Sequence, residues 1–305
     1  MGKKLKRGEA EEIQRLAALG LPPITSRWCL GTMLGVNAGI FRSMELRPHR
    51  YYRNFRLASG NKVRNIRAPK AGLKVVQRWI AHNLANAYVA PDHVYGFVSG
   101  RSHIDAAMQH VNASWVVSVD ISDFFPSTPV SVVRSRLLSI GYQEVAANLI
   151  TSLVTYEESL PQGAPTSPVL SNICFGPSDL KMAAIAEHYD ARITRYADDI
   201  VFSGETGIPH ADILVSVRDH FERTCWDINE RKVRISQAPN RRKVHGLLVH
   251  GGSVRLTKGY RNRIRAYKHL LNTRSDIPQE DYHSIMGHVS YADHLAELVG
   301  KSDSN

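Results

Sequence analysis

The sequence is poor in cysteine and has no long hydrophobic run. Its three cysteines, Cys29, Cys174 and Cys225, are an odd number at wide spacings, which argues against a disulfide framework and against a Cys-x-x-Cys zinc site. No segment stays apolar for the 18 or more residues that a membrane span needs. The basic amino terminus runs straight into acidic residues, so it does not read as a secretory signal. These absences predict a cytoplasmic protein with no membrane partner.

Acidic residues are outnumbered by basic ones. The chain of 305 residues has 39 lysines and arginines against 28 aspartates and glutamates, a formal net charge of +11. A small-molecule enzyme does not need this excess, whereas a protein that binds a polyanion such as nucleic acid does. The 43% hydrophobic content is enough for one large core or two smaller ones. The sequence has no internal repeat and no low-complexity tract.

Hydrophobic periodicity predicts a mixture of helices and short strands. We expect helices at about 9–19, 71–88, 129–139, 142–155, 168–188, 210–224 and within 257–305. We expect strands from 51 to a turn at 59–61, then at 62–66, 114–120, 192–196, 200–203 and 232–236, with a hairpin around 243–256. The first two strands form a basic hairpin.

Three aspartates are the sharpest chemical feature. Asp120 ends an apolar strand, and the pair Asp198 and Asp199 occupies the turn of a hairpin. Neighbouring carboxylates repel one another unless a cation lies between them. Two Mg²⁺ ions about 4 Å apart would suit in-line phosphoryl transfer. Alternatively, the pair is a solvated hairpin tip and Asp120 a helix cap. Strand alternation puts Tyr196 and Asp198 on one side and Asp199 on the other, which makes Asp198 the safer metal ligand.

Three sequence blocks together resemble the reverse transcriptases. They are SVDISDFFPS at 118–127, LPQGAPTSP at 160–168 and RYADD at 195–199, and the resemblance extends from about 51 to at least 256. It implies an α+β right-hand polymerase fold with fingers, a palm built on an antiparallel sheet, and a helical thumb. The expected domains are an N-terminal helical region at 1–48, fingers at 49–115, a palm at 116–250 with finger helices inserted at about 127–158, and a thumb at 251–305.

The resemblance also implies a metal site. Asp120, Asp198 and Asp199 would be the catalytic carboxylates that hold two Mg²⁺ ions, and the backbone carbonyl of Ile121 would complete one site.

Five further residues match positions where this family binds the incoming deoxynucleoside triphosphate. Phe125 would exclude a ribose 2′-hydroxyl, and Gln162 with Gly163 would lie beside the templating base pair. Arg64 would contact the triphosphate, and Lys232 would lie near the leaving pyrophosphate. Each position also has a plainer interpretation: a core ring for Phe125, a Pro/Gly turn at 162–163, a generic phosphate contact for Arg64 and a solvated lysine.

A basic helix is expected after residue 257. Its cations Arg261, Arg265 and Lys268 share one face at helical spacing, opposite a buried stripe of Ile264, Tyr267 and Leu271. The helix has no acidic partner of its own for these cations. This pattern favours RNA binding along a phosphate backbone over a merely solvated face.

Within the family, the retron and group II intron enzymes are most similar. The segment VYGFVSGRS at 94–102 and the short chain favour the retron type. Two retron elements depart from their usual pattern: Ala106 replaces the first Asn of Asn-Ala-x-x-His, and His245 replaces the Thr of Val-Thr-Gly. We interpret His110 and His245 as structural or RNA-contacting residues.

The retron resemblance implies an enzyme that copies part of a structured noncoding RNA into single-stranded DNA. Synthesis would start from an RNA 2′-hydroxyl, and the branched RNA–DNA product would stay bound. A role in anti-phage defence with an effector protein from the same locus is also implied. The alternatives are a group II intron-like or diversity-generating reverse transcriptase, or a subunit that mainly holds nucleic acid as a scaffold.

Overall fold

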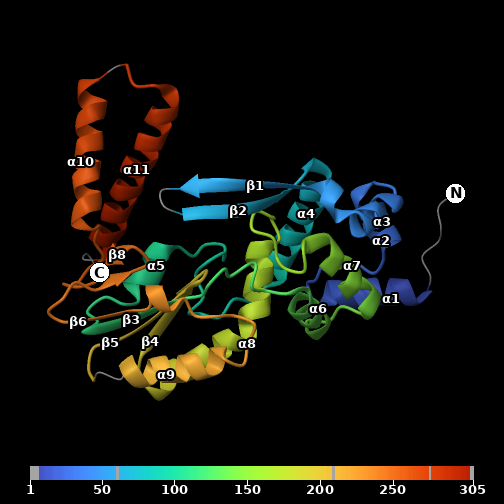
Figure 1. The fold of residues 1–305 in the computed structure, drawn as a ribbon, viewed down its shortest axis with the longest axis horizontal. Coiled ribbons are helices and arrows are strands. Elements are labelled where there is room, and N and C mark those ends of the chain that lie inside the picture. The colour runs from blue at the N-terminus through green and yellow to red at the C-terminus, as the bar shows by residue number, and fades with distance from the viewer. Residues whose placement is uncertain (1–6, 60–61, 208–209, 275, 303–305) are drawn as a thin grey trace.

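The computed structural model describes residues 7–59, 62–207, 210–274 and 276–302. It has the α+β right-hand fold of polymerases, with a central sheet as the palm (Figure 1). Helices of the N-terminal half gather at one end, and a long hairpin reaches from them across the palm. A pair of helices rises from the opposite end as the thumb. The proposed domain boundaries remain predictions.

The first helix, the finger hairpin and the helix after it match the sequence periodicity, whereas the short helices at 27–34, 39–46 and 48–51 were not individually predicted. The N-terminal and finger elements are α1 (Arg7–Ala18), α2 (Arg27–Leu34), α3 (Gly39–Leu46), η1 (Pro48–Tyr51), β1 (Tyr52–Ser59), β2 (Lys62–Pro69) and α4 (Ala71–Ala87). The helices expected at 9–19 and 71–88 and the basic hairpin are therefore confirmed, although residues 60 and 61 of the expected turn lie outside the described residues. Leu73, Ile80 and Leu84 bury the apolar stripe of α4.

The palm combines four strands with flanking helices. Its elements are β3 (Trp115–Asp120), α8 (Ser167–His188), β4 (Arg192–Tyr196), β5 (Asp199–Gly204), α9 (His210–Phe221), η2 (Glu230–Lys232) and β6 (Arg234–Gln237). Helix α5 (His103–Met108) precedes β3, and the inserted helices α6 (Val130–Ser139) and α7 (Glu144–Val154) lie with the helices of the finger end (Figure 1). The sheet order is β4-β5-β3-β6, and every pairing is antiparallel. The strand expected at 232–236 begins at Arg234, because Lys232 belongs to the 3₁₀ turn before it.

Strand β3 is buried on both faces. Trp115, Val117 and Val119 belong to the main core with residues of α8 and α9, whereas Val116 belongs to a second core with residues of α5 and β8. A nearly continuous apolar strand is typical of such double burial. The strand ends at Asp120, whose position is therefore set by two packed layers.

The thumb rests on this second core. A short hairpin, β7 (Lys243–Val244) and β8 (Leu247–Leu248), precedes its two helices, α10 (Lys258–Thr273) and α11 (Gln279–Ser302). Leu295 of α11 shares the second core with Val116 and Val244. The thumb is thus packed against the palm through its second helix.

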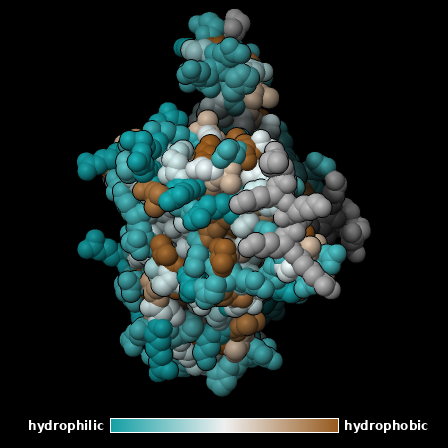
Figure 2. All heavy atoms as spheres, turned by 90° about the vertical axis from the view of Figure 1, so that its right-hand side faces the viewer, coloured by the Kyte–Doolittle hydropathy of each residue, from teal (hydrophilic) through white to brown (hydrophobic). Residues whose placement is uncertain are grey.

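The surface at the finger end is mostly hydrophilic (Figure 2). Hydrophobic side chains are scattered among polar ones, as on most soluble domains. Within the described residues, no helix combines the length and apolar character needed to cross a bilayer.

Candidate active site

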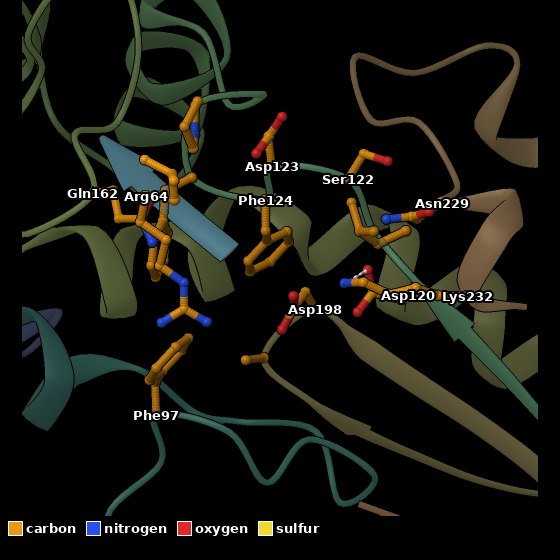
Figure 3. A pocket seen from close by; sticks show the side chains of 15 residues that line it. Arg64, Phe97, Asp120, Ser122, Asp123, Phe124, Gln162, Asp198, Asn229 and Lys232 are labelled. Atoms are coloured by element: carbon orange, nitrogen blue, oxygen red, sulfur yellow. Dashed lines mark hydrogen bonds and ion pairs between the residues drawn. The ribbon is translucent and has the colours of Figure 1, made fainter. Parts of the chain in front are cut away.

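A cavity of about 510 Å³ lies between the finger hairpin and the end of the palm sheet. Figure 3 shows side chains from several elements pointing into it. Seven of the residues predicted from the sequence line this cavity: Arg64, Asp120, Ile121, Phe125, Gln162, Asp198 and Lys232. They come from segments far apart in the chain, so the fold has gathered them. Asp199 and Gly163 do not line it.

Asp120 and Asp198 face this cavity from adjacent parts of the sheet. Asp120 is the last residue of β3, and the backbone N–H of Ile121 donates to the Asp198 carbonyl at 2.9 Å. This bond fastens the turn to the end of β3. Burial, and next the nearby Asp120 carboxylate, raises the pKa of Asp198 above its ordinary value. Two carboxylates thus share a space in which their negative charge is unfavourable.

Lys232 forms an ion pair with Asp120. Its Nζ lies 2.5 Å from Asp120 Oδ1, and the 3₁₀ turn that carries it is tied to β3 by a bond from the Asn229 N–H to the Asp120 carbonyl at 2.8 Å. The Lys232 side chain is about 39% exposed. Lys232 is therefore at the cavity, in contact with a carboxylate.

Asp199 points to a different place from Asp198. The hairpin register pairs Tyr196 with Asp199 across a two-residue turn, and Ala197 has a φ of +58°. Tyr196 and Asp199 therefore share a face of the sheet, because the turn interrupts the strand alternation that would have put Tyr196 with Asp198. Asp199 accepts hydrogen bonds from Ser118 Oγ at 2.8 Å and His245 Nδ1 at 3.0 Å.

Asp120 and Asp199 also line a second cavity, of about 620 Å³, with basic residues of β6 and β7. Within the described ranges, no three His, Cys, Asp or Glu side chains are grouped so that they could hold a metal ion. The pair Asp120 and Asp198 nevertheless fits a hard divalent cation, because both offer carboxylate oxygens and a cation would offset the burial of Asp198. The three-carboxylate site stays a prediction.

Two aromatic rings form one wall of the active-site cavity. Phe125 is half-buried, and Phe97 lies against it with ring centroids 5.8 Å apart. Phe97 is 42% exposed and has a φ of +61°, an unfavourable backbone conformation for a bulky residue. The guanidinium of Arg64 extends toward this ring (Figure 3). The sequence analysis did not assign Phe97 to the site, although the segment 94–102 that carries it had been singled out.

Gly163 has a structural reason of its own. Its φ is +119°, and a Cβ atom there would lie 2.9 Å from Ile66 Cγ2. The neighbouring Gln162 carbonyl accepts a bond from the Arg67 N–H at 2.8 Å. The glycine thus lets this loop seat against β2, while Gln162 reaches the cavity.

A buried ion pair that was not predicted from the sequence supports the turn at 197–198, which carries Asp198. Arg195 and Asp179 of α8 are each 1% exposed and form two bonds of 2.7 Å. Arg195 also donates to the Ala197 carbonyl at 3.0 Å and to Asn172 Oδ1 at 3.1 Å. Asn172 in turn donates to the Gly96 carbonyl at 3.0 Å. The sequence offered one signal for this pair, because Arg195 and Asp179 are charged residues within otherwise apolar segments.

The predicted RNA-binding cations lie away from the cavity, on thumb helix α10. Arg261 and Arg265 are exposed, but Lys268 Nζ lies 2.7 Å from Asp293 of α11. The expectation that Lys268 lacks an acidic partner holds only within its own helix. The buried stripe on α10 is also partial, because Ile264 is buried whereas Tyr267 and Leu271 are half-exposed.

A palm sheet that presents carboxylates to a basic finger hairpin defines a right-hand nucleotide polymerase. Residues 58–249 match the family described as reverse transcriptase (RNA-dependent DNA polymerase). Retron Mx65 reverse transcriptase of Myxococcus xanthus is 30% identical over 292 residues, covering 88% of this chain and 68% of that protein. Retron Ec86 reverse transcriptase of Escherichia coli is 27% identical over 99% of both chains.

A solved foamy viral protease-reverse transcriptase bound to an RNA/DNA hybrid aligns with a TM-score of 0.48 and 17% identity, over 82% of this chain and 30% of that one. The sequence matches decide the family. The chain belongs to the reverse transcriptases, as a retron-type RNA-directed DNA polymerase.

Proposed function

We propose that this enzyme copies part of a structured noncoding RNA into single-stranded DNA, starts from a 2′-hydroxyl of that RNA, and keeps the branched product bound. The observation that carries the polymerase chemistry is the single cavity shared by Arg64, Asp120 and Asp198. The retron relatives support the choice of template and product.

We propose that the cofactor is a pair of Mg²⁺ ions held by Asp120, Asp198, Asp199 and the Ile121 carbonyl. When bound, these ions would activate the attacking hydroxyl and stabilise the leaving phosphate oxygens. Asp199 already accepts hydrogen bonds from Ser118 and His245, so it would have to bind a metal ion through a lone pair that these bonds leave free. Asp120 would exchange its contact with Lys232 for a metal ion, which would release the ammonium toward the leaving pyrophosphate.

The remaining cavity residues suit an incoming deoxynucleoside triphosphate. Arg64 approaches from the fingers and would neutralise the phosphates. Phe125 would occupy the space beside the sugar 2′ position, while Gln162 and Gly163 would support the templating base pair. Arg261 and Arg265, with Lys268 in a lesser part, would hold RNA on the thumb. A cytoplasmic role in phage defence, together with an effector protein, completes the proposal.

The metal assignment is tested with Asp198→Asn. We expect primer extension on an RNA template to disappear, while the free energy of unfolding without metal stays equal or rises, because the substitution removes a buried charge beside Asp120. Asp219→Asn, on the exposed face of α9, is the matched control. Wild-type extension by Asp198→Asn would contradict the assignment.

The retron product is tested on protein expressed with its native flanking locus. Nucleic acid extracted from the purified complex should give a discrete band that shifts with ribonuclease, shifts again with a 2′,5′-debranching enzyme, and disappears with deoxyribonuclease. Asp198→Asn should retain RNA alone. Unbranched DNA or heterogeneous RNA would instead favour an intron-like or diversity-generating enzyme. If the Asp198→Asn complex, which makes no DNA, kept its function in the cell, the alternative of a subunit that mainly holds nucleic acid would be favoured.

A further inference from the structure

A line of hydrogen bonds crosses one face of the palm and ends on Asp199. At its inner end, His110 Nδ1 lies 2.6 Å from Ser203 Oγ, and His110 Nε2 lies 2.7 Å from Thr194 Oγ1. Thr194 Oγ1 lies 3.0 Å from His245 Nε2. His245 Nδ1 lies 3.0 Å from Asp199 Oδ2. We name these five residues the palm relay.

The sheet register explains why the relay forms. Thr194 pairs with Val201 on the next strand, and Tyr196 pairs with Asp199. Residues two apart share a face of a strand, so Thr194, Asp199 and Ser203 stand in one row. The two histidines come from outside the sheet and lie over this row.

The relay is shielded from solvent except at its catalytic end. His110, Thr194 and Ser203 are fully buried, and the His245 side chain is 2% exposed, whereas the Asp199 side chain is 30% exposed. The histidines therefore present no surface to RNA in this structure. Of the two interpretations that the sequence left open for them, burial favours the structural one.

Hydrogen-bond chemistry fixes the direction of every proton in the relay when both rings are neutral. A carboxylate only accepts, so His245 donates from Nδ1 and accepts at Nε2 from the Thr194 hydroxyl. Thr194 then accepts from His110 Nε2–H, and Ser203 donates to His110 Nδ1. Burial lowers the pKa of His110 to about 3, so this ring is neutral at physiological pH. Each bond carries one proton, and no group is left without a partner.

His245 lies in a tight hairpin turn, and this turn determines where its ring is placed. His245 and Gly246 join β7 to β8, and both have positive φ, +45° and +91°. A two-residue hairpin turn of this kind favours Asn and Gly over a ring. The ring is retained despite that cost, and it also packs at 5.8 Å against Tyr196.

We propose that His245, held by Thr194 and His110, is a positioning residue that sets the direction of the Asp199 carboxylate. This inference rests on the proposed function in that Asp199 is taken as a metal ligand. The relay holds Oδ2 of Asp199, and Ser118 holds Oδ1. The remaining lone pairs of Asp199 are thereby aimed in a fixed direction beside Asp120.

The proton directions are tested on the full-length protein labelled with ¹⁵N-histidine. Long-range ¹H–¹⁵N spectra should show neutral His110 protonated at Nε2 and His245 protonated at Nδ1. Thr194→Val should leave the fold intact and change both ring signals. A His245 ring protonated only at Nε2 in the wild type would overturn the proposal.

The effect on the site is tested with Thr194→Val, a near-isosteric change that touches neither nucleotide nor metal. We expect about a tenfold loss in kcat for primer extension with the nucleotide KM unchanged, and about tenfold weaker Mn²⁺ binding without nucleic acid, as for other partners of metal ligands. Thr151→Val is the control, because Thr151 is buried and its hydroxyl has no partner among the described residues. Wild-type behaviour of Thr194→Val would overturn the proposal.

Two further variants separate this proposal from the proposed function. His245→Asn keeps an N–H near the Nδ1 position but cannot accept from Thr194, so it should lose about tenfold, as Thr194→Val does, and combining the two changes should cost little more. The Mn²⁺ effect of Thr194→Val should vanish in an Asp199→Asn background, since coupled residues are not additive. Full activity of Asp199→Asn would contradict the metal assignment; an inactive Asp199→Asn with additive effects would contradict the relay alone.

Discussion

At the residue scale, two adjacent aspartates have different surroundings because a turn separates them. Asp198 lies in the turn and faces the cavity between the finger hairpin and the palm sheet, whereas Asp199 begins β5 and is held by Ser118 and His245. The positive φ of Ala197 is the local cause, since it reverses the chain in two residues. A substitution at either aspartate is therefore expected to have a different physical effect.

Phe125 gives a prediction at the same scale. Phe125→Val should let ribonucleotides compete with deoxyribonucleotides, because a smaller side chain opens space beside the sugar while the carboxylates stay in place. Incorporation of each sugar type is compared for the two proteins. Phe55→Val, at a half-exposed ring outside the cavity lining, should leave the preference unchanged. An unchanged preference in Phe125→Val would make Phe125 a packing residue.

At the element scale, the segment before α5 supports the turn at 197–198 that carries Asp198. Val94 forms a parallel bridge with Arg195, and the Tyr95 N–H donates to the Arg195 carbonyl at 2.8 Å. A Cβ atom at Gly96 would lie 2.1 Å from the backbone nitrogen of Ala197. The glycine is therefore required by close backbone approach rather than by its own φ.

Gly96→Ala should displace this turn. We expect a loss of about 1 to 3 kcal/mol in the free energy of unfolding, as for other overpacked sites, and a loss of at least about tenfold in primer extension, since a displacement near 1 Å impairs alignment. Denaturant unfolding and single-turnover extension measure the two effects. Gly287→Ala in α11, where an added Cβ meets no atom within 4 Å, should leave extension unchanged. Equal behaviour of both variants would contradict this account.

The thumb helix α10 gives a second prediction for elements. Arg261→Ala combined with Arg265→Ala should weaken RNA binding and reduce the slope of log K against log salt by about 1.4 to 1.8, because each lost phosphate contact removes about 0.7 to 0.9. Binding is measured as a function of salt. Lys268→Ala should change the slope less, because its ammonium pairs with Asp293. An unchanged slope in the double variant would mean that this face is only solvated.

At the scale of the whole molecule, the candidate active site is a cavity lined by residues of both the fingers and the palm. Arg64 reaches the cavity from β2, while Asp120 and Lys232 reach it from the palm sheet and the turn beside it. The loop at Gly163 packs against β2, and the neighbouring Gln162 lines the same cavity. The shape of the cavity therefore depends on how β2, the loop at Gly163 and the end of the palm sheet pack together.

Buried His110 predicts how the stability of the whole protein depends on pH. Burial, and next His245 and Arg192, lowers the pKa of His110 to about 3, below the value of about 6.5 in an unfolded chain. Between these values the unfolded state binds a proton that the folded state does not, so stability is complete above about pH 6.5 and falls as the pH falls. The contribution is about 1.4 kcal/mol per pH unit.

His110→Gln should remove this dependence. Urea unfolding of both proteins between pH 4 and 7 measures it, and the wild type should lose stability more steeply toward pH 4. His283→Gln, at an exposed position of α11, is the control and should follow the wild type. Parallel curves for His110→Gln and the wild type would contradict the prediction.

The sequence by itself determined most of the longer elements and the family, but not the short helices α2, α3 and α5. Period-two and helical patterns identified the basic hairpin, α4 and the four palm strands, because burial of one face leaves a periodic trace in the chain. The three blocks around Asp120, Gln162 and Asp198 indicated a polymerase by their resemblance to the reverse transcriptases, and the structure brings all three residues to one cavity. Neighbouring residues in a strand or turn have few geometric options, so local patterns suffice for these conclusions.

The tertiary structure alone decided the surroundings of each side chain. The sequence could not show that Lys232 contacts Asp120, that Lys268 pairs with Asp293, or that His110 and His245 connect to Asp199. In the three directly bonded pairs, Lys232 with Asp120, His245 with Asp199 and Lys268 with Asp293, the partners are 25 to 112 residues apart in the chain. Such contacts depend on how twisted sheets and packed helices meet in space, which periodicity along one segment does not encode.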